Sequence, residues 1–548
     1  MKKQVSAWLL LFAVACMGWL PAKAQQKYWV FLTDKKGSDL NPYTYFDAKA
    51  LERRVRQNLP LYDETDLPLN AAYVATVTGM VDSVRWESRW FNAVSCYAKP
   101  QQIAALQKLP FVREVMPIKS MVALAAFSAE PDTETLDETQ KKLLQEQVAS
   151  LGIADFQAKN LDGSGMRVAV LDAGFTAADV APALEHLYKQ NRILQTYDFV
   201  KKKPFVYSFS SHGTQVLSCI AGMYKGQQVG LATGAEFLLA RTEKHLSEPF
   251  SEEENWLAAV EWADKNGADI INSSLAYTYH RYFQEQMNGK TSLVARAANL
   301  AAKKGILVVN SAGNDGSNSW KKIGTPADAD SVLTVGGIDE NTRYRISFSS
   351  YGPTADKRMK PNVVAFGHVM AASPGGLAST SGTSFSSPLV AGFAACAWQQ
   401  NRSLTNMQLF REIEKSGNLY PYFDYAHGFG VPQAAYFTKT APDSIAPSFS
   451  FVDNGVTLEV LVPDATPQAE PVAQLEGTDQ PAVQTTASDD KPEAFLYYHI
   501  QNSKGQLDKY YVVKVNKPQV LILNKEEIGT GKTIRVSYKH YTQEYKIQ

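Results

Sequence analysis

Residues 147–437 repeat one pattern, in which an apolar strand is followed by a turn and an amphipathic helix, and this pattern restricts the possible fold more than any other feature. The expected strands are short and almost continuously apolar, at 166–171, 236–241, 268–274, 306–311 and 331–336. Helical stretches at 253–265 and 291–304 lie between them. Strands that are apolar on both sides need helices on both sides, so we predict an α/β domain with a doubly wound, mostly parallel sheet over 147–440.

Two smaller modules flank this domain. Residues 27–118 alternate strand and helix patterns in the order β-α-β-β-α-β, which predicts a ferredoxin-like α+β module at 25–120. After Pro442 the pattern changes to alternating apolar strands divided by Gly, Asn, Asp and Pro turns, which predicts an all-β, sandwich-like domain at 441–548. The stretch 121–146 is acidic and lacks strand or core character, so we expect an exposed, cleavable linker there.

Three helices are expected inside the N-terminal module. Leu51 and Val55 stand four residues apart in the first, at 47–57, which gives it an apolar stripe. The second covers 71–80. The third begins at Pro100, because proline fits the first turn of a helix, where no N–H donor is needed.

The N-terminus has the pattern of a secretory signal peptide. Two lysines precede an apolar run at 8–20, and residues 22–24 have the small-x-small arrangement that signal peptidase cuts. The run is shorter than the roughly 20 apolar residues that span a bilayer. We therefore predict removal of 1–24 and export of the chain as a secreted, periplasmic or cell-surface protein, with a retained anchor or a lipid on Cys16 as the alternatives.

The charges of the chain balance. Lys+Arg and Asp+Glu number 55 each, so the formal net charge is zero. A neutral chain has no overall field that attracts nucleic acid or an anionic membrane. We therefore expect no nucleic-acid partner and no membrane span in the mature chain, and any partner must be recognised at a local site.

The four cysteines, Cys16, Cys96, Cys219 and Cys396, are too few for a disulfide scaffold, and no Cys/His cluster has the spacing of zinc ligands. The fold must therefore rest on a large apolar core. Cys219 and Cys396 lie on the apolar faces of expected helices, so we expect buried free thiols, with a disulfide between neighbouring helices as the alternative.

Three short segments of the α/β domain place a reactive side chain beside glycine. Asp172 ends an apolar strand two residues before Gly174, while His212 and Ser384 each open an apolar helix. The carboxyl ends of parallel strands and the amino ends of the following helices converge on one crevice, so an acid, a base and a nucleophile can meet there. Each residue alone has an ordinary reading as a turn or cap residue. Together they predict an Asp172, His212, Ser384 triad.

These segments resemble the D-x-G, H-G-T and G-T-S-x-[SA]-x-P blocks of the subtilisin-like serine peptidases. The resemblance extends to 306–315, which is similar to the family strand that ends in the oxyanion-hole asparagine, here Asn314. Residues 270–276 resemble the edge of the primary specificity pocket, which makes Ser274, Leu275 and Ala276 candidate substrate-binding residues. Residues 27–118 look like the inhibitory, chaperone-like propeptide of the family.

The resemblance implies a role for each residue. Ser384 would attack the scissile carbonyl, His212 would accept its proton, and Asp172 would hold the imidazole in the correct tautomer. Asn314, together with the backbone N–H of Ser384, would stabilise the tetrahedral oxyanion.

The sequence departs from the family pattern at two positions. Ala173 follows Asp172 where the family often has Ser or Thr, which removes one hydroxyl donor to the carboxylate. Ala276 stands where many members have Gly, so an extra methyl group narrows the expected pocket. The acidic stretch 250–254 either favours basic substrate residues or forms the acidic first turn of a helix.

We therefore predict an exported serine endopeptidase that is made as a zymogen and whose partners are polypeptide substrates and its own propeptide. No metal-binding motif is present, so no cofactor is expected to be required, and calcium is implied by the family resemblance only. The main alternative is a catalytically silent binding or scaffold protein on the same fold. An esterase would need a Gly-x-Ser-x-Gly elbow, which Ser384 lacks.

Overall fold

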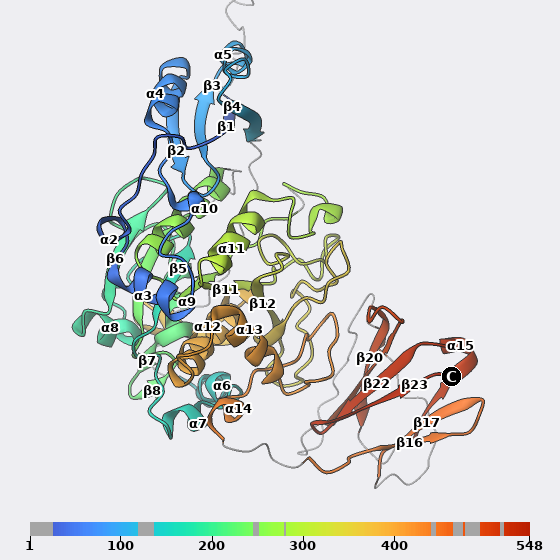
Figure 1. The fold of residues 1–548 in the computed structure, drawn as a ribbon. Coiled ribbons are helices and arrows are strands. Elements are labelled where there is room, and N and C mark those ends of the chain that lie inside the picture. The colour runs from blue at the N-terminus through green and yellow to red at the C-terminus, as the bar shows by residue number, and fades with distance from the viewer. Residues whose placement is uncertain are drawn as a thin grey trace, which may run out of the picture. The chain divides into compact units, whose positions relative to one another are not determined.

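The structure is a computed structural model that describes residues 26–118, 136–244, 251–278, 281–439, 445–463, 475–476, 494–515 and 520–548. The predicted signal peptide at 1–24 and Cys16 lie outside these ranges. The chain forms two compact units, one made of Met1–Leu40 and Asp63–Ser120 and the other of Asn41–Tyr62 and Met121–Gln548 (Figure 1). Within the described ranges, no helix has both the length and the apolar character needed to cross a bilayer.

The first unit is a four-stranded antiparallel sheet with two helices. The strands stand in the order β2-β3-β1-β4, and their bounds are β1 (Gln26–Leu32), β2 (Ser83–Ser88), β3 (Ala93–Ala98) and β4 (Val112–Ile118). The helices are α4 (Ala71–Met80) and α5 (Pro100–Leu106). Val30, Val77 and Leu106 meet in one apolar core. This order of strands and helices is ferredoxin-like, so the prediction for the N-terminal module is confirmed.

The helix expected at 47–57 forms as α3 (Ala48–Arg56), but it belongs to the second unit, together with the short α2 (Pro42–Tyr45). Asp47 is the N-cap of α3, and its carboxylate accepts a hydrogen bond from the backbone N–H of Lys49. The sequence pattern therefore predicts the helix correctly but assigns it to the N-terminal module, whereas it belongs to the second unit.

The second unit contains a parallel sheet of seven strands in the order β13-β12-β11-β10-β5-β9-β6. The strands are β5 (Arg167–Asp172), β6 (Ile193–Asp198), β9 (Glu236–Arg241), β10 (Ile270–Ser273), β11 (Leu307–Ser311), β12 (Val332–Ile338) and β13 (Val363–Phe366). β5 and β10 are neighbours although β6 and β9 of the same sheet come between them in the chain, so the strand order reverses between them. The crevice at the carboxyl ends of strands beside such a reversal is the usual ligand site of open α/β sheets.

Helices cover both faces of this sheet (Figure 1). Val168 and Val170 of β5 share one apolar cluster with α9 (His212–Ala221) and α12 (Thr383–Gln400). The intervening Ala169 is also fully buried, and successive side chains of a strand point to opposite faces. α10 (Ser251–Lys265) contacts β5, and α11 (Leu293–Lys303) contacts β11. The predicted doubly wound α/β architecture is therefore confirmed.

Shorter elements complete the α/β domain. They are α7 (Ile153–Gln157), α8 (Glu185–Lys189), β7 (Met223–Tyr224), β8 (Gln227–Gln228), β14 (His368–Ser373), β15 (Gly376–Ser381), α13 (Asn406–Lys415) and α14 (Ala435–Thr438). β14 and β15 pair as an antiparallel hairpin that leads directly into α12.

The range 121–146 is only partly a linker. A helix, α6 (Glu138–Ala149), begins inside it, with Asp137 as the N-cap and a capping box to Gln140. Leu143 and Leu144 of α6 join the apolar core, and the side chain of Gln147 donates to two buried carbonyl oxygens. The linker prediction is therefore wrong from 138 onward, because the acidic composition hides one apolar helix face; 121–135 lie outside the described residues.

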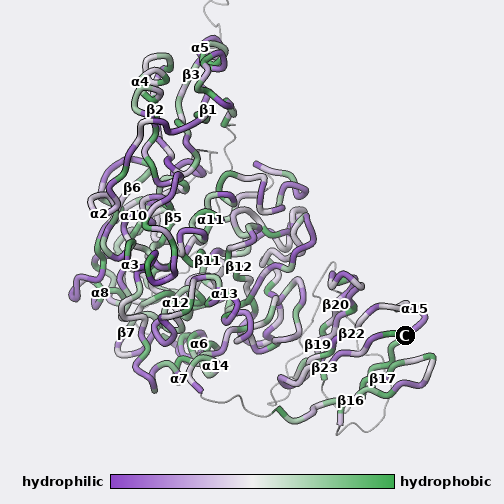
Figure 2. Tube along the Cα trace, viewed as in Figure 1, coloured by the Kyte–Doolittle hydropathy of each residue, from purple (hydrophilic) through white to green (hydrophobic). Residues whose placement is uncertain are grey.

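The C-terminal domain consists of two antiparallel sheets. One contains β16 (Ser450–Asp453), β17 (Thr457–Leu461) and β21 (Val520–Asn524), and the other β18 (Leu475–Glu476), β19 (Ala494–Gln501), β20 (Leu507–Val515), β22 (Thr533–Tyr538) and β23 (Tyr541–Lys546), with α15 (Lys525–Ile528) after β21. β17 is hydrophobic, green in Figure 2, and its Leu458 packs with Leu496 and Val536 of the other sheet. Two sheets around one apolar core confirm the all-β, sandwich-like prediction.

His499 of β19 links this domain to a loop of the α/β domain. Its ring is fully buried, and its Nδ1–H donates to the carbonyl oxygen of Phe423 at 2.6 Å. Its Nε2 is buried without a hydrogen-bond partner among the described residues. A proton on Nε2 would be a buried donor without an acceptor, and burial lowers the pKa of His499 to about 4. The folded state therefore holds this histidine neutral.

Replacing His499 with glutamine is expected to reduce the loss of stability in acid. Glutamine keeps a side-chain N–H for Phe423 but does not titrate. Between the folded pKa of about 4 and the ordinary value of about 6.5, the unfolded chain binds the extra proton, so the free energy of unfolding falls as the pH falls through this window. Urea unfolding at about pH 7 and pH 4.5 should show the unaltered protein losing about 2–3 kcal/mol more than the variant. Equal losses in the two proteins would contradict this expectation.

Candidate active site

Asp172 and His212 form a buried pair. Asp172 is the last residue of β5 and is 0% exposed, and His212 is the first residue of α9 and is 8% exposed. The Nδ1–H of His212 donates to Oδ1 of Asp172 at 2.8 Å, and the backbone N–H of Ala173 donates to the same oxygen at 2.7 Å. Oδ2 of Asp172 is buried without a hydrogen-bond partner among the described residues, consistent with alanine at 173. The pair fixes the tautomer in which Nε2 of His212 is the base.

Two glycines allow the pair to form. The backbone N–H of Gly213 donates to the carbonyl oxygen of Gly174 at 3.0 Å, so the turn after β5 lies directly against the start of α9. A Cβ at 213 would lie 2.5 Å from that oxygen, and a Cβ at 174 would lie 2.4 Å from the carbonyl oxygen of Ser208. Gly174 also has a φ of 146°, which side chains disfavour. The hydroxyl of Thr214 donates to the carbonyl oxygen of Thr176 and ties the same two segments together.

Ser384 is the second residue of α12. Its carbonyl oxygen accepts a hydrogen bond from Ser274, because a proline in the helix removes the usual donor. Pro388 has no N–H, so the carbonyl oxygen of Ser384 lacks its usual partner four residues later. The hydroxyl of Ser274, just after β10, donates to that oxygen at 2.7 Å. The hydroxyl of Ser384 donates in turn to the carbonyl oxygen of Ser274 at 3.1 Å. This reciprocal pair holds Ser384 at the carboxyl end of β10.

The ring of His212 lies beside the start of α12. The centroid of this ring is 5.4 Å from the centroid of the Phe385 ring. Ser384 and His212 are each 8% exposed. The predicted acid, base and nucleophile are therefore brought to the carboxyl ends of β5 and β10, where the strand order reverses.

Asn314 follows β11 and contacts the same helix end. Its Oδ1 accepts hydrogen bonds from the backbone N–H and the hydroxyl of Thr383, each at 2.9 Å. Because Oδ1 faces Thr383, the donor Nδ2 lies on the other side of the amide, and a Cβ at Gly382 would be 3.4 Å from it. Asn314 is exposed, so this donor is available to a molecule in the crevice. The structure thus places Asn314 next to Ser384, as the sequence predicts.

The predicted substrate-binding residues follow β10. Leu275 and Ala276 are half-buried, and the carbonyl oxygen of Leu275 accepts a hydrogen bond from Nδ2 of Asn310 at 2.8 Å. The methyl group of Ala276 would lie 3.4 Å from a Cβ at Gly313 and 3.1 Å from one at Gly324. The side chain of Ala276 therefore lies beside two glycines. Ser274 differs, since it is 5% exposed and its side chain is engaged by Ser384.

Glu252, Glu253 and Glu254 form the acidic first turn of α10, which is one of the two expectations for the acidic stretch, and all three are buried. Glu252 and Glu253 lie in the first turn of α10 and pair with Arg281, the former at 2.7 Å and the latter at 3.4 Å. Burial and the neighbouring Glu243 raise the pKa of Glu252 to about 11. Two of the acidic side chains thus contact one buried arginine inside the domain. Sequence reasoning missed this cluster, because nothing in the pattern identifies Arg281 as the partner.

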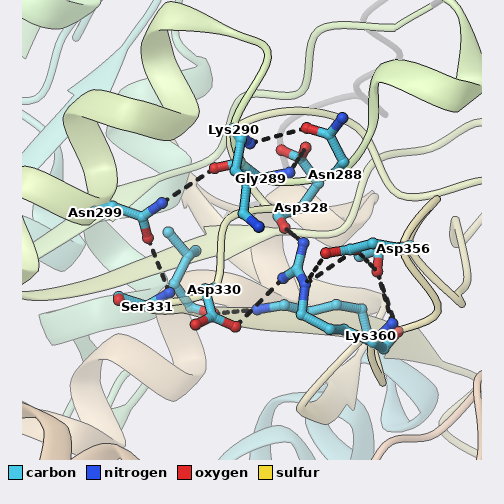
Figure 3. A network of polar contacts seen from close by, with 12 residues as sticks. Asn288, Gly289, Lys290, Asn299, Asp328, Asp330, Ser331, Asp356 and Lys360 are labelled. Atoms are coloured by element: carbon cyan, nitrogen blue, oxygen red, sulfur yellow. Dashed lines mark hydrogen bonds and ion pairs between the residues drawn. The ribbon is translucent and has the colours of Figure 1, made fainter.

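A polar network includes Asp328, Asp330 and Ser331, which come just before β12 in the chain (Figure 3). The buried carboxylate of Asp328 accepts a hydrogen bond from the backbone N–H of Gly289 at 2.7 Å. Asn299 of α11 donates to the carbonyl oxygen of Gly289 and accepts from the backbone N–H of Ser331. These contacts join α11 to the loop that starts β12.

The basic groups of this network are the side chains of Arg358 and Lys360. Arg358 donates to the carbonyl oxygen of Asp328 at 2.9 Å, and burial lowers the pKa of the nearby Lys360 to about 7. Among the residues that the structure describes, no group of three or more His, Cys, Asp or Glu side chains could hold a metal ion.

Cys96, Cys219 and Cys396 are fully buried, and Cys219 and Cys396 form no disulfide. Burial raises the pKa of Cys219 to about 12, so this thiol is inert. The expectation of buried free thiols at Cys219 and Cys396 is confirmed, and the alternative disulfide is wrong.

Comparison with known proteins identifies the family of two parts of the chain. The model of the Subtilase family matches residues 163–430, and that of the Peptidase S8 propeptide domain, Bacteroidota, matches 27–134. M-protease of Shouchella clausii (strain KSM-K16) is 30% identical over 300 residues, which are 53% of this chain and 70% of the relative. Subtilisin Savinase of Lederbergia lenta is 32% identical over 274 residues, which are 48% of this chain and 90% of the relative.

Among solved structures, a cold adapted subtilisin-like serine proteinase aligns with a TM-score of 0.41 and 24% identity, over 50% of this chain and 90% of that chain. The two curated relatives are matched over more than two thirds of their own lengths at 30% identity or more. The chain therefore belongs to the subtilase family of serine peptidases and carries a propeptide domain ahead of its peptidase domain.

Proposed function

We propose that the protein is an exported endopeptidase that cleaves polypeptides through Asp172, His212 and Ser384 and frees itself from its own propeptide. The observation that carries this proposal is the buried Asp172–His212 pair, held at 2.8 Å next to the helix end that carries Ser384 and contacts Asn314. Export rests on the signal-peptide pattern at 1–24.

The reaction follows from the positions of the donors and acceptors. In the free enzyme the hydroxyl of Ser384 donates to the carbonyl oxygen of Ser274, and attack on a peptide carbonyl requires this proton to pass to Nε2 of His212. Asp172 accepts the Nδ1–H throughout and stabilises the imidazolium. His212 then protonates the leaving amine, and water completes hydrolysis of the acyl-enzyme by the same route in reverse.

The oxyanion of the tetrahedral intermediate would lie at the amino end of α12. The first backbone N–H groups of a helix have no partner within the helix, so the N–H of Ser384 is a suitable donor. Nδ2 of Asn314 is the second donor, since its amide is oriented by Thr383. Substrate side chains would lie against Leu275 and Ala276, where the methyl group of Ala276 restricts the space.

Replacing Ser384 with alanine is expected to leave the exported protein as a precursor that starts near Gln25. Without the nucleophile, the chain can neither cut between its propeptide and peptidase domains nor react with a fluorophosphonate probe. N-terminal sequencing of the exported protein and labelling with the probe measure the two effects together.

Ser403→Ala, at an exposed position beyond α12, is the matched control and should be processed and labelled normally. If purified Ser384→Ala matures with no other protease present, self-processing is wrong. If the unaltered protein fails to label, the endopeptidase proposal is wrong, and the catalytically silent scaffold remains.

A further inference from the structure

Residues Asn41–Tyr62, the anchor segment, form part of the same compact unit as the peptidase domain, although they lie inside the propeptide match at 27–134. The segment contains α2 and α3. The propeptide sequence on either side of it belongs to the other unit. The propeptide thus contributes one stretch of chain to the fold of the peptidase domain.

Arg53 of α3 is inserted where two helices of the peptidase domain end. Its guanidinium donates to the carbonyl oxygens of Ala268 and Lys304, which follow α10 and α11, and is 1% exposed. Lys304 is the C-cap of α11, and the last carbonyl oxygens of a helix have no partner within the helix and carry its negative dipole end. Ala268 lies three residues beyond the end of α10. Arg53 therefore supplies the donors for two carbonyl oxygens in the segments that follow α10 and α11.

Two buried aspartates of the peptidase domain pair with cations of the anchor segment. Asp264 pairs with Arg53 and with Arg54, the latter at 2.8 Å. Asp269 pairs with Arg56 at 2.9 Å and with Lys49 at 3.4 Å. Both aspartates are 1% exposed. A buried carboxylate needs such partners, because removing one side of a buried ion pair is strongly destabilising.

The anchor segment and the peptidase domain also make close backbone contacts. The N–H of Asp47 donates to the carbonyl oxygen of Lys265 at 2.9 Å, and Gln57 donates to the carbonyl oxygen of Gly305 at 2.7 Å. A Cβ at Gly305 would lie 2.9 Å from Nε2 of Gln57, and a Cβ at Gly267 would lie 2.9 Å from Cβ of Lys49. The segment is therefore packed as tightly as an internal element of the domain.

The anchor segment lies at the edge of the sheet opposite the active site. Its partners Asp269 and Gly305 come just before β10 and β11 begin, at Ile270 and Leu307. The triad lies at the carboxyl ends of the strands, as described above. Because neighbouring strands run parallel, these two edges are on opposite sides of the domain, so the segment leaves Ser384 accessible.

We propose that the anchor segment stays bound to the active enzyme after the chain is cut between the propeptide and peptidase domains. The mature enzyme then contains two chains, of which the N-terminal one is held by Arg53, Arg54, Arg56 and Lys49. The cut therefore leaves the edge of the sheet before β10 and β11 covered by the anchor segment. This inference goes beyond peptidase activity, since it concerns the composition of the active protein.

The test uses full-length Ser384→Ala chains that carry a recognition sequence for an added protease within 121–135. After cutting, gel filtration and native mass spectrometry measure whether the N-terminal fragment stays with the peptidase domain. We expect a stable one-to-one complex, and in Arg53→Met/Arg54→Met we expect the fragment to dissociate at least about 100-fold faster. Arg113→Met, an exposed propeptide position outside the segment, is the control and should behave like the parent chain.

Because all chains lack the nucleophile, failure of self-processing does not affect this result. Circular dichroism before cutting shows whether each variant folds, and Lys49→Met/Arg56→Met replaces the double arginine variant if that one does not. Release of the parent fragment on the column would overturn the proposal, as would equal dissociation from the parent and variant complexes. The proposal would also be overturned if peptide mapping of the active, unaltered enzyme found no peptides from residues 41–62.

Discussion

Replacing His212 with alanine is expected to lower kcat/KM for a short chromogenic peptide by about 10⁴–10⁶-fold, a range taken from subtilisin itself and not from this geometry. The variant loses the base that takes the proton of Ser384, and the buried carboxylate of Asp172 loses its partner at 2.8 Å. The substitution leaves the proposed substrate-binding residues Leu275 and Ala276 unchanged, so KM should change little. Steady-state kinetics on purified, fully processed protein measure the effect, and fluorophosphonate labelling should be lost in parallel.

Processing itself depends on the triad, so the His212→Ala chain has to be cut by an added protease within 121–135 before its activity is measured. His540→Ala is the matched control, because His540 is exposed and lies in the C-terminal domain. Activity of His212→Ala within tenfold of the unaltered enzyme would exclude His212 as the base. Unchanged labelling would exclude it independently of the peptide chosen.

The positions of these residues along the chain could be predicted because each motif has a local physical cause. The backbones at Gly174 and Gly213 are joined by a direct hydrogen bond, and a side chain at either position would clash, so both positions require glycine. An apolar strand that ends in a carboxylate and a helix that begins with an imidazole are also local signals. The parallel sheet then brings these separate segments to one edge without further information from the sequence.

Contacts between distant segments could not be predicted in this way. The helix 47–57 is evident from its apolar stripe, but nothing local indicates that Arg53 and Arg54 meet Asp264 in another domain. The pairing of Glu252 with Arg281 was missed for the same reason. Such ion pairs depend on three-dimensional proximity, which composition and periodicity do not encode.

Two further features of the fold are not evident from the sequence. The acidic composition of 121–146 outweighed the apolar spacing of Leu143, Leu144 and Val148, which places α6 in the core. Pro388 in a helix predicts that the carbonyl oxygen of Ser384 lacks its intrahelical donor, but only the structure identifies Ser274 as the replacement. Ser274 therefore has a positioning contact in addition to the substrate-binding place that the family resemblance implies.

Replacing Asn314 with alanine is expected to lower kcat by about 10²–10³-fold with little change in KM, again a magnitude measured on subtilisin. The amide Nδ2 would donate to an oxygen that becomes negative only in the transition state, so its loss raises the barrier without weakening substrate binding. Measuring kcat and KM separately on the same peptide distinguishes this role from a role in binding, which would raise KM instead.

The alanine variant has a second defect, because Oδ1 of Asn314 also accepts hydrogen bonds from the backbone N–H and hydroxyl of Thr383 at the start of α12. Asn314→Asp separates the two effects, since it keeps an acceptor for Thr383 and removes the donor. If Asn314 stabilises the oxyanion, the aspartate variant should lose at least as much kcat as the alanine variant, because its negative charge repels the developing charge. If the aspartate variant recovers kcat to within tenfold of the unaltered enzyme, Asn314 acts by holding Thr383, and the oxyanion donors must be backbone N–H groups of α12 alone.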